Sequence, residues 1–107
     1  MSQPIHVTEA EYELMAALWR CGPLSPPDLL AAVQARRDWS GSTIKTLLSR
    51  LMHRKAIVAE RDRGRLRYRP LLDRQTYVDG EVQALVDRLF DGDPAKLAAR
   101  LSVRGDD

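Results

Sequence analysis

A chain of 107 residues with 44% hydrophobic and 30% charged residues is long enough for one ordinary domain and too apolar to be disordered. Its single cysteine, Cys21, excludes an internal disulfide and a cysteine-rich zinc site. The N-terminal stretch lacks the apolar core of a signal peptide, and no run approaches the roughly 18 apolar residues of a membrane span. We therefore expect a cytoplasmic protein without a membrane partner.

The net charge of +2 hides a strong separation of charges along the chain. Residues 40–70 hold nine lysines and arginines against two acids, whereas residues 71–107 hold five against eight. A segregated basic segment is typical of a protein that binds a polyanion, although a run of charges can also be a solvated face. The place of these cations in the fold decides between the two interpretations.

Two helices are predicted at the start of the chain. Thr8 and Glu11 form a capping box, and apolar residues at helical spacing then predict a helix over residues 9–20, which ends before a Gly-Pro pair. A Ser-Pro-Pro sequence at residues 25–27 predicts the start of a second helix, because proline is tolerated in a first turn. This second helix is expected to end near residues 35–39.

A third helix is predicted over residues 40–55, with Ser40 as its cap. Its inner stripe follows helical spacing and consists of Ile44, Leu47, Leu48, Leu51 and Met52. The opposite side and its flanks carry hydroxyls, cations and an imidazole: Ser42, Thr43, Lys45, Thr46, Ser49, Arg50, His53 and Arg54. This outer face contains no acidic residue, whereas an ordinary solvated helix face usually mixes both signs of charge.

Residues 57–71 change from helical to alternating periodicity, which predicts a β-hairpin. The first strand is expected at residues 57–60 and the return strand at residues 66–71. Residues 62–65 are a plausible tight turn, with Gly64 available for a positive φ.

Arginines occupy every second position in this hairpin: Arg61, Arg63, Arg65, Arg67 and Arg69. Side chains two residues apart on a strand point to the same face, so the last three are expected to share one face of the return strand. The face of Arg61 and Arg63 depends on the register of the hairpin. Arg63 or Arg65, nearest the tip, is expected to be the arginine most exposed to a partner.

The remaining residues predict a helical region with an unpartnered apolar stripe. One helix is expected from residue 73 to residue 90, a second from residue 94 to residue 101, and a frayed end after it. The stripe consists of Val78, Val82, Leu85, Val86, Leu89 and Phe90, followed by Leu97 and Leu101. It could pack on its own domain, but a second copy of the chain is the commonest partner for such a surface.

The order of three helices, a hairpin and further helices predicts a mostly α fold with a small β-hairpin, the winged helix-turn-helix, followed by C-terminal dimerisation helices. We place the winged-helix domain at residues 1–71 and the dimerisation region at residues 72–107. In this arrangement the third helix enters the major groove of DNA, and the wing, residues 60–70, touches the backbone or minor groove. Cations on both elements release condensed counterions from DNA.

Five stretches support the same assignment: "TEAEYELMAALW", "GPLSPPDLL", "DWSGSTIKTLLSRLMHRKAI", "RYRPLL" and "LFDGDPAKL". Together, over residues 5–101, they resemble the penicillinase-repressor family of bacterial winged-helix regulators, the BlaI/MecI/CopY group. The resemblance implies a transcriptional repressor that binds an inverted-repeat operator in double-stranded DNA as a homodimer.

Matching positions supply the candidate contacts. The resemblance implies that Thr43, Lys45 and Thr46 contact bases and phosphates and that Arg50 clamps a phosphate. Ser42 is a weaker candidate, because the family usually has Pro-Lys where this chain has Gly-Ser. The full candidate set for DNA binding is Ser42, Thr43, Lys45, Thr46, Arg50, Arg54, Arg63, Arg65 and Arg67.

The chain also departs from the family at its C-terminal end. Copper-responsive members carry a C-terminal cysteine cluster that is missing here, so we expect no copper sensing and no cofactor. Penicillinase-type members are inactivated by a sensor-linked protease near an Asn-Phe pair. The corresponding Arg100-Leu101 pair does not match, which leaves that route of derepression open.

Other classes of function find little support. His6 and His53 have no ligand partners at metal-binding spacing, and no nucleophile motif or phosphate-binding loop is present, so we expect neither a metal site nor an enzyme. The alternative is a winged helix that serves as a protein-interaction module. Such modules tend to lose the cations of the third helix and the wing, which this chain retains.

Overall fold

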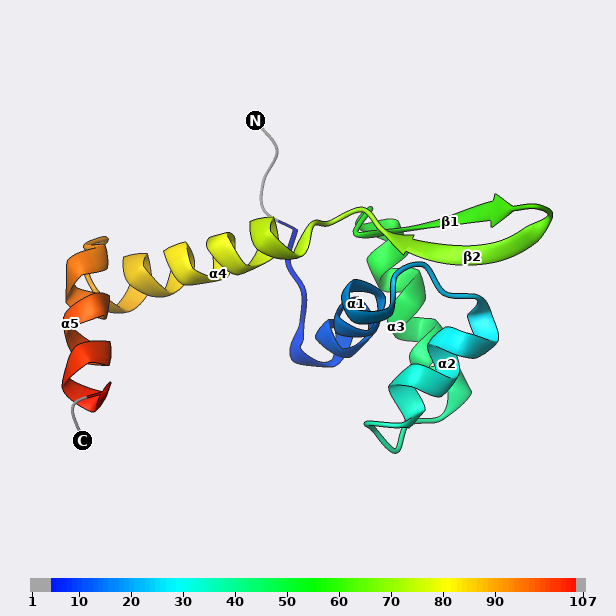
Figure 1. Ribbon diagram of the computed structural model, residues 1–107, viewed down its shortest axis with the longest axis horizontal. Coiled ribbons are helices and arrows are strands. Elements are labelled where there is room, and N and C mark those ends of the chain that lie inside the picture. Colours follow the sequence, from blue (N-terminus) through cyan, green and yellow to red (C-terminus); the bar gives the residue numbers. More distant parts are fainter. Residues whose placement is uncertain (1–4, 106–107) are drawn as a thin grey trace. The chain divides into compact units, whose positions relative to one another are not determined.

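A computed structural model describes residues 5–105, and the chain divides after Asp73 into two compact units (Figure 1). The elements are α1 (Glu9–Cys21), α2 (Pro26–Gln34), α3 (Gly41–His53), β1 (Ile57–Asp62), β2 (Arg65–Pro70), α4 (Arg74–Leu89) and α5 (Pro94–Gly105). The predicted winged helix-turn-helix, mostly α with one hairpin, is confirmed. No helix in the described part of the chain has the length and hydropathy needed to span a bilayer.

Side-chain caps start the three helices of the first unit where they were predicted. Thr8 Oγ1 accepts from the Glu11 N–H at 3.1 Å, and Glu11 Oε1 accepts from the Thr8 N–H at 3.0 Å, which completes the capping box. Ser25 and Ser40 cap α2 and α3 through single hydrogen bonds of 3.3 and 3.2 Å to first-turn N–H groups. Each cap satisfies a backbone donor that the helix itself leaves unpaired.

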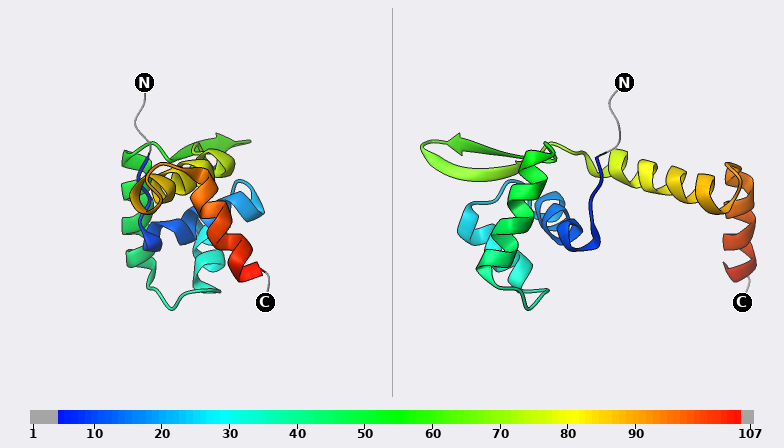
Figure 2. Two further views of the ribbon diagram at one scale, coloured as in Figure 1. Left: turned by 90° about the vertical axis from the view of Figure 1, so that its left-hand side faces the viewer. Right: turned by 180° about the vertical axis from the view of Figure 1, so that it is seen from behind.

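The core of the first unit lies between α1, α2 and α3, which are grouped together in both views of Figure 2. Its buried apolar side chains are Val7, Leu14, Met15, Ala17, Leu18, Leu29, Val33, Ile44, Leu47, Leu48, Leu51, Ala56 and Ile57. The inner stripe of α3 is therefore buried as predicted, except for Met52, which is half-buried at the last turn. Burial of this stripe turns the opposite face of α3 to solvent.

Lys55 ends α3 in an unusual backbone conformation for its residue type. The Lys55 N–H donates to Met52 O at 3.0 Å, and the Ala56 N–H donates to Leu51 O at 2.9 Å, which is the Schellman pattern of a helix end. In this motif the residue after the cap is left-handed and usually glycine. Lys55 takes that place with φ 63°.

Lys55→Gly is expected to raise the free energy of unfolding by about 0.5–1 kcal/mol, because relief of left-handed strain outweighs the greater flexibility of glycine. Urea denaturation measures the difference. Lys55→Ala is the control, because it removes the same charge and leaves the strained φ in place. Equal stability of the glycine and alanine variants would contradict this account of the helix end.

The hairpin is longer toward its tip than predicted. β1 and β2 pair antiparallel from Ile57↔Pro70 to Asp62↔Arg65, so only Arg63 and Gly64 lie in the turn. Their φ values are 54° and 81°, the pair of positive values that a type I′ turn requires. The expected positive φ at Gly64 is confirmed.

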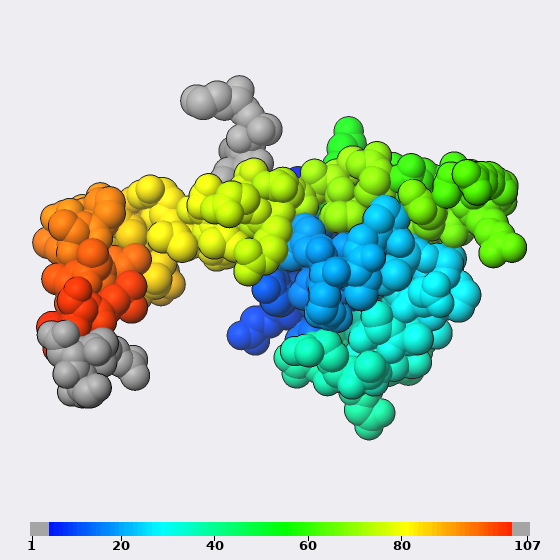
Figure 3. Space-filling view, in the orientation of Figure 1, coloured from blue at the N-terminus to red at the C-terminus, as the bar shows by residue number. Residues whose placement is uncertain are grey.

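The base of the hairpin is also tied to the α1–α2 connection. The Leu24 N–H donates to Tyr68 O at 3.1 Å, and the Tyr68 N–H donates to Leu24 O at 2.7 Å, so β2 is paired on both sides at this point. The tip has no such support and projects at the edge of the first unit (green in Figure 3). The hairpin therefore has a fixed base and a free tip.

The second unit consists of α4 and α5. Asp93 caps α5 by accepting from the Ala95 N–H at 3.0 Å, and Pro94 occupies its first turn. The helix continues to Gly105, so the prediction of a frayed end after residue 101 was wrong for residues 102–105. No glycine or proline lies between Pro94 and Gly105, and residues 106–107 lie outside the described residues.

Candidate nucleic-acid interface

The outer face of α3 is exposed and free of acids. Its exposed side chains are Ser42, Thr43, Lys45, Thr46, Ser49, Arg50 and His53. The helix contains no Asp or Glu, and Lys45 and Arg50 form no ion pair within the described residues. Their charges are therefore available to an external anion. The major groove of DNA admits an α-helix, and the hydroxyls and cations of this face can bind base edges and phosphates there.

The hydroxyl groups of α3 are held in place by its N-terminal turn. Ser40 Oγ donates to Thr43 Oγ1 at 3.1 Å and lies 3.2 Å from Ser42 Oγ. Thr46 Oγ1 donates to Ser42 O at 3.0 Å. Thr43 accepts from Ser40 and so keeps its own hydroxyl hydrogen for a partner, whereas Thr46 has donated its hydrogen and keeps its acceptor lone pairs.

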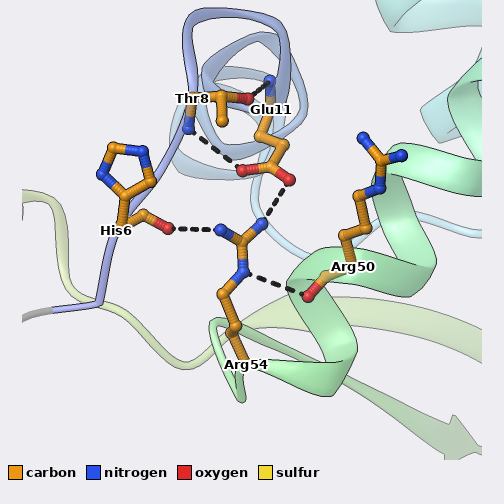
Figure 4. A network of polar contacts seen from close by, with 5 residues as sticks. All are labelled: His6, Thr8, Glu11, Arg50 and Arg54. Atoms are coloured by element: carbon orange, nitrogen blue, oxygen red, sulfur yellow. Dashed lines mark hydrogen bonds and ion pairs between the residues drawn. The ribbon is translucent and has the colours of Figure 1, made fainter.

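Arg54, a predicted member of the contact set, lies in a network with other protein groups (Figure 4). Its guanidinium forms an ion pair with Glu11 Oε2 and donates to His6 O at 2.9 Å and to Arg50 O at 3.3 Å. The Arg50 guanidinium points away from this network. The Glu11–Arg54 ion pair joins the start of α1 to the end of α3, so Arg54 holds α3 against α1.

Glu11 is the buried charged residue of the described core, with 1% of its surface exposed. Burial by itself raises the pKa of its carboxyl, but hydrogen bonds from Thr8 and Arg54 and the charge of Arg54 outweigh burial. The pKa of Glu11 therefore lies below its ordinary value. One carboxylate serves both the α1 capping box and the link to α3.

The hairpin register divides the five arginines. Residues directly opposite on antiparallel strands share a face, so Arg61, opposite Leu66, lies on the face of Leu66 and Tyr68. Arg65, Arg67 and Arg69 share the other face, as predicted from alternation. Arg63 lies in the turn itself.

Two of these arginines have acidic partners. Arg69 Nε lies 2.5 Å from Glu60 Oε1, and Arg67 Nη1 lies 3.4 Å from Asp62 Oδ2. Within the described residues, Arg61, Arg63 and Arg65 are exposed and form no ion pair, and Arg61 donates to Gly64 O in the turn at 3.0 Å. The free charge of the hairpin is therefore at its tip.

Sequence reasoning did not find the Glu11–Arg54 link or the acidic partners of the hairpin. The first joins residues far apart in sequence, and nothing in the local pattern points to it. The second had a signal: a two-residue turn at Arg63-Gly64 places Asp62 opposite Arg65 and Glu60 opposite Arg67. No group of three His, Cys, Asp or Glu side chains in the described part of the chain could hold a metal ion.

Known proteins resemble both the sequence and the fold. An uncharacterized 16.5 kDa protein of Latilactobacillus sakei is 31% identical over 83 residues, 78% of this chain and 57% of that protein. The penicillinase repressor of Bacillus licheniformis is 23% identical and the methicillin resistance regulatory protein MecI of Mammaliicoccus sciuri 26% identical, each over 80% of this chain. The alignments span 67% and 70% of those two proteins.

The solution structure of monomeric B. licheniformis BlaI in complex with the blaP half-operator matches with a TM-score of 0.64 and 25% identity, over 72% of this chain and 94% of that one. The solution structure of the DNA-binding domain of the repressor BlaI matches with a TM-score of 0.62 and 25% identity. The family model described as "Penicillinase repressor" matches residues 7–106. The chain therefore belongs to the penicillinase repressor family.

Proposed function

We propose that this protein is a cytoplasmic, sequence-specific DNA-binding transcriptional repressor that acts as a homodimer on an inverted-repeat operator. The observation that carries the proposal is the exposed, acid-free outer face of α3, where Lys45 and Arg50 form no ion pair with any residue of the range 5–105. The cationic tip of the hairpin lies in the same unit. In this proposal α3 enters the major groove and the hairpin contacts the backbone or minor groove. The structure of the BlaI half-operator complex supports it by fold similarity.

The proposed contacts follow from exposure and free hydrogen-bonding groups. They are Ser42, Thr43, Lys45, Thr46 and Arg50 on α3, with Arg63 and Arg65 on the hairpin. We leave out Arg54 and Arg67, because acidic groups of the protein already bind them. Base choice is assigned to Thr43, Lys45 and Thr46, since hydrogen bonds to base edges carry sequence information and phosphate contacts only position the protein.

The homodimer is proposed from the apolar surface of the second unit. Only Val86 of the predicted stripe is buried, while Val82, Leu89 and Leu101 remain 45%, 57% and 60% exposed. Val78, Leu85, Phe90 and Leu97 are half-buried. Exposed apolar residues recurring along two helices favour association, and a two-fold copy of the same surface is the commonest partner. The first unit is accordingly assigned to DNA and the second to dimerisation.

For control by a sensor-linked protease, the proposal names one peptide bond to be tested for cleavage. Arg100 and Leu101 are exposed, but their peptide bond lies inside α5, so cleavage there requires local unfolding. Mapping the fragments formed on induction in cells decides the point. A repressor that stays intact while its genes are induced would rule out this route.

Selection of bound duplexes from random DNA tests the function. We expect an enriched inverted repeat, because two α3 helices related by a two-fold axis read the same half-site in opposite orientations. Leu89→Glu, which places a charge on the exposed stripe, is expected to weaken binding to the full repeat more than to one half-site. Folded protein that enriches no sequence would favour a protein-interaction module instead.

A further inference from the structure

The charged groups on one face of the hairpin nearly cancel. The register places Glu60 opposite Arg67 and Asp62 opposite Arg65, so both acids share the face of Arg65, Arg67 and Arg69. Three arginines and two acids leave this face with one net positive charge. The run of alternating arginines in the sequence therefore overstates the charge that the hairpin can offer to DNA.

The ion pairs run diagonally across the two strands. Glu60 Oε1 lies 2.5 Å from Arg69 Nε, and Asp62 Oδ2 lies 3.4 Å from Arg67 Nη1. The Nε atom of Arg67 is buried and has no hydrogen-bond partner within the described residues. The Nε end of the guanidinium is thus covered by the protein, while 37% of the Arg67 side chain remains exposed. Arg63 and Arg65 are exposed at the tip.

We propose that Glu60 and Asp62 hold Arg69 and Arg67, so that the hairpin cations offered to DNA phosphates on this face and at the turn are Arg65 and Arg63, with Arg61 on the opposite face. This inference rests on the proposed DNA-binding function. It names the groups that limit the sequence-independent binding of the hairpin to DNA phosphates. Glu60 and Asp62 thereby become determinants of binding strength that act without touching DNA.

The backbone explains why the pairs persist beside a phosphate. Strand pairing fixes diagonal neighbours about 7–8 Å apart, within reach of long side chains, so an acid cannot move away when its arginine reaches outward. An arginine that leaves its partner for a phosphate would bring an unpaired carboxylate close to the DNA backbone. The repulsion between carboxylate and phosphate offsets the new attraction, whereas Arg63 and Arg65 break no ion pair of the described residues when they bind a phosphate.

Two variants, each of which removes two arginines, separate the paired arginines from those of the tip. The first, Glu60→Gln, Asp62→Asn, Arg67→Gln and Arg69→Gln together, removes both pairs and leaves the net charge unchanged. We expect its affinity for random duplex DNA to stay within about twofold and its salt slope to stay unchanged, since no phosphate contact is lost. The second, Arg63→Asn with Arg65→Gln, should lower the slope of log K against log salt by about 1.8 per subunit. Asparagine suits the first position of a type I′ turn.

A third variant tests the acids directly. Glu60→Gln with Asp62→Asn frees Arg69 and Arg67, so the affinity for random duplex should rise at least several-fold and the salt slope should steepen. Glu81→Gln with Asp79→Asn, a loss of two exposed acids on α4, is the control for net charge and should change little. Thermal unfolding of each variant checks that the hairpin remains folded.

The inference fails if the variant with all four substitutions lowers the salt slope as much as the tip variant does. It also fails if Glu60→Gln with Asp62→Asn leaves the affinity for random duplex unchanged. The first result would show that Arg67 and Arg69 already bind phosphates in the wild type, and the second that Glu60 and Asp62 do not limit binding. Failure of the proposed function looks different, because the wild-type chain itself would then show no salt-dependent binding to any duplex.

Discussion

Arg54→Met is expected to lower the free energy of unfolding by about 3 kcal/mol, because it leaves the buried carboxylate of Glu11 without its charged partner. Methionine keeps most of the apolar stem, so the loss reports the ion pair and the two hydrogen bonds to backbone carbonyls. We place the effect at the lower end for a broken buried pair, since 30% of the Arg54 side chain is exposed. Urea denaturation of the full chain measures it.

Arg50→Met is the matched control, because Arg50 lies one turn earlier on the same helix and forms no ion pair within the described residues. A surface substitution of this kind usually changes stability by no more than about 0.5 kcal/mol. Equal losses for the two variants would contradict the role given to Arg54. A contact to DNA alone predicts no loss of stability in either case.

The dependence of stability on pH gives a second readout for the same pair. The pKa of Glu11 in the folded protein is lowered, so the stability it contributes is present above its ordinary pKa of 4.5 and is lost as pH falls through the folded value. In Arg54→Met the pKa of Glu11 should rise, because burial is no longer opposed by the arginine. The gap in stability between wild type and variant should therefore narrow as the pH falls below 4.5.

Lys45→Ala is expected to weaken operator binding by about 10–100-fold, the range for one lost contact that discriminates between bases. Lys45 is exposed in the middle of the outer face of α3 and has no acidic partner among the described residues. Its affinity for random duplex should fall much less, because sequence-independent binding depends on the sum of the phosphate contacts. Fluorescence anisotropy with both duplexes measures the two losses.

Lys55→Ala is the control for charge, since Lys55 is an exposed lysine just after the same helix and outside its outer face. We expect both of its affinities to stay close to those of the wild type. If Lys45→Ala and Lys55→Ala weaken the operator and random duplex alike, Lys45 acts only as a distant charge and the assignment of base choice to this face is wrong.

The elements that could be predicted from the sequence are those with local causes. The caps at Thr8, Ser25 and Ser40 satisfy backbone donors three residues away, so they mark helix starts without any knowledge of the fold. The spacing of the inner stripe predicts the face of α3 that is buried, and by difference the face that is exposed. Local chemistry therefore identifies both the winged-helix order and the candidate reading face.

The features that could not be predicted depend on contacts between distant segments. Arg54 flanks the outer face by helical geometry, yet its side chain binds Glu11, which is 43 positions earlier in the sequence. The role of Arg67 depended on the register, which a shift of the turn by one residue would change. Charges that look alike in the sequence thus differ in the fold, because some have protein partners and others do not.

The central claim is that α3 reads DNA sequence, and the ratio of two affinities of the wild-type chain tests it most directly. A duplex obtained by selection and a duplex with the same bases in scrambled order are titrated at one fixed salt concentration. We expect the selected duplex to bind at least about 10³-fold more tightly, as specific DNA-binding proteins do. Equal affinity for the two duplexes would contradict the claim.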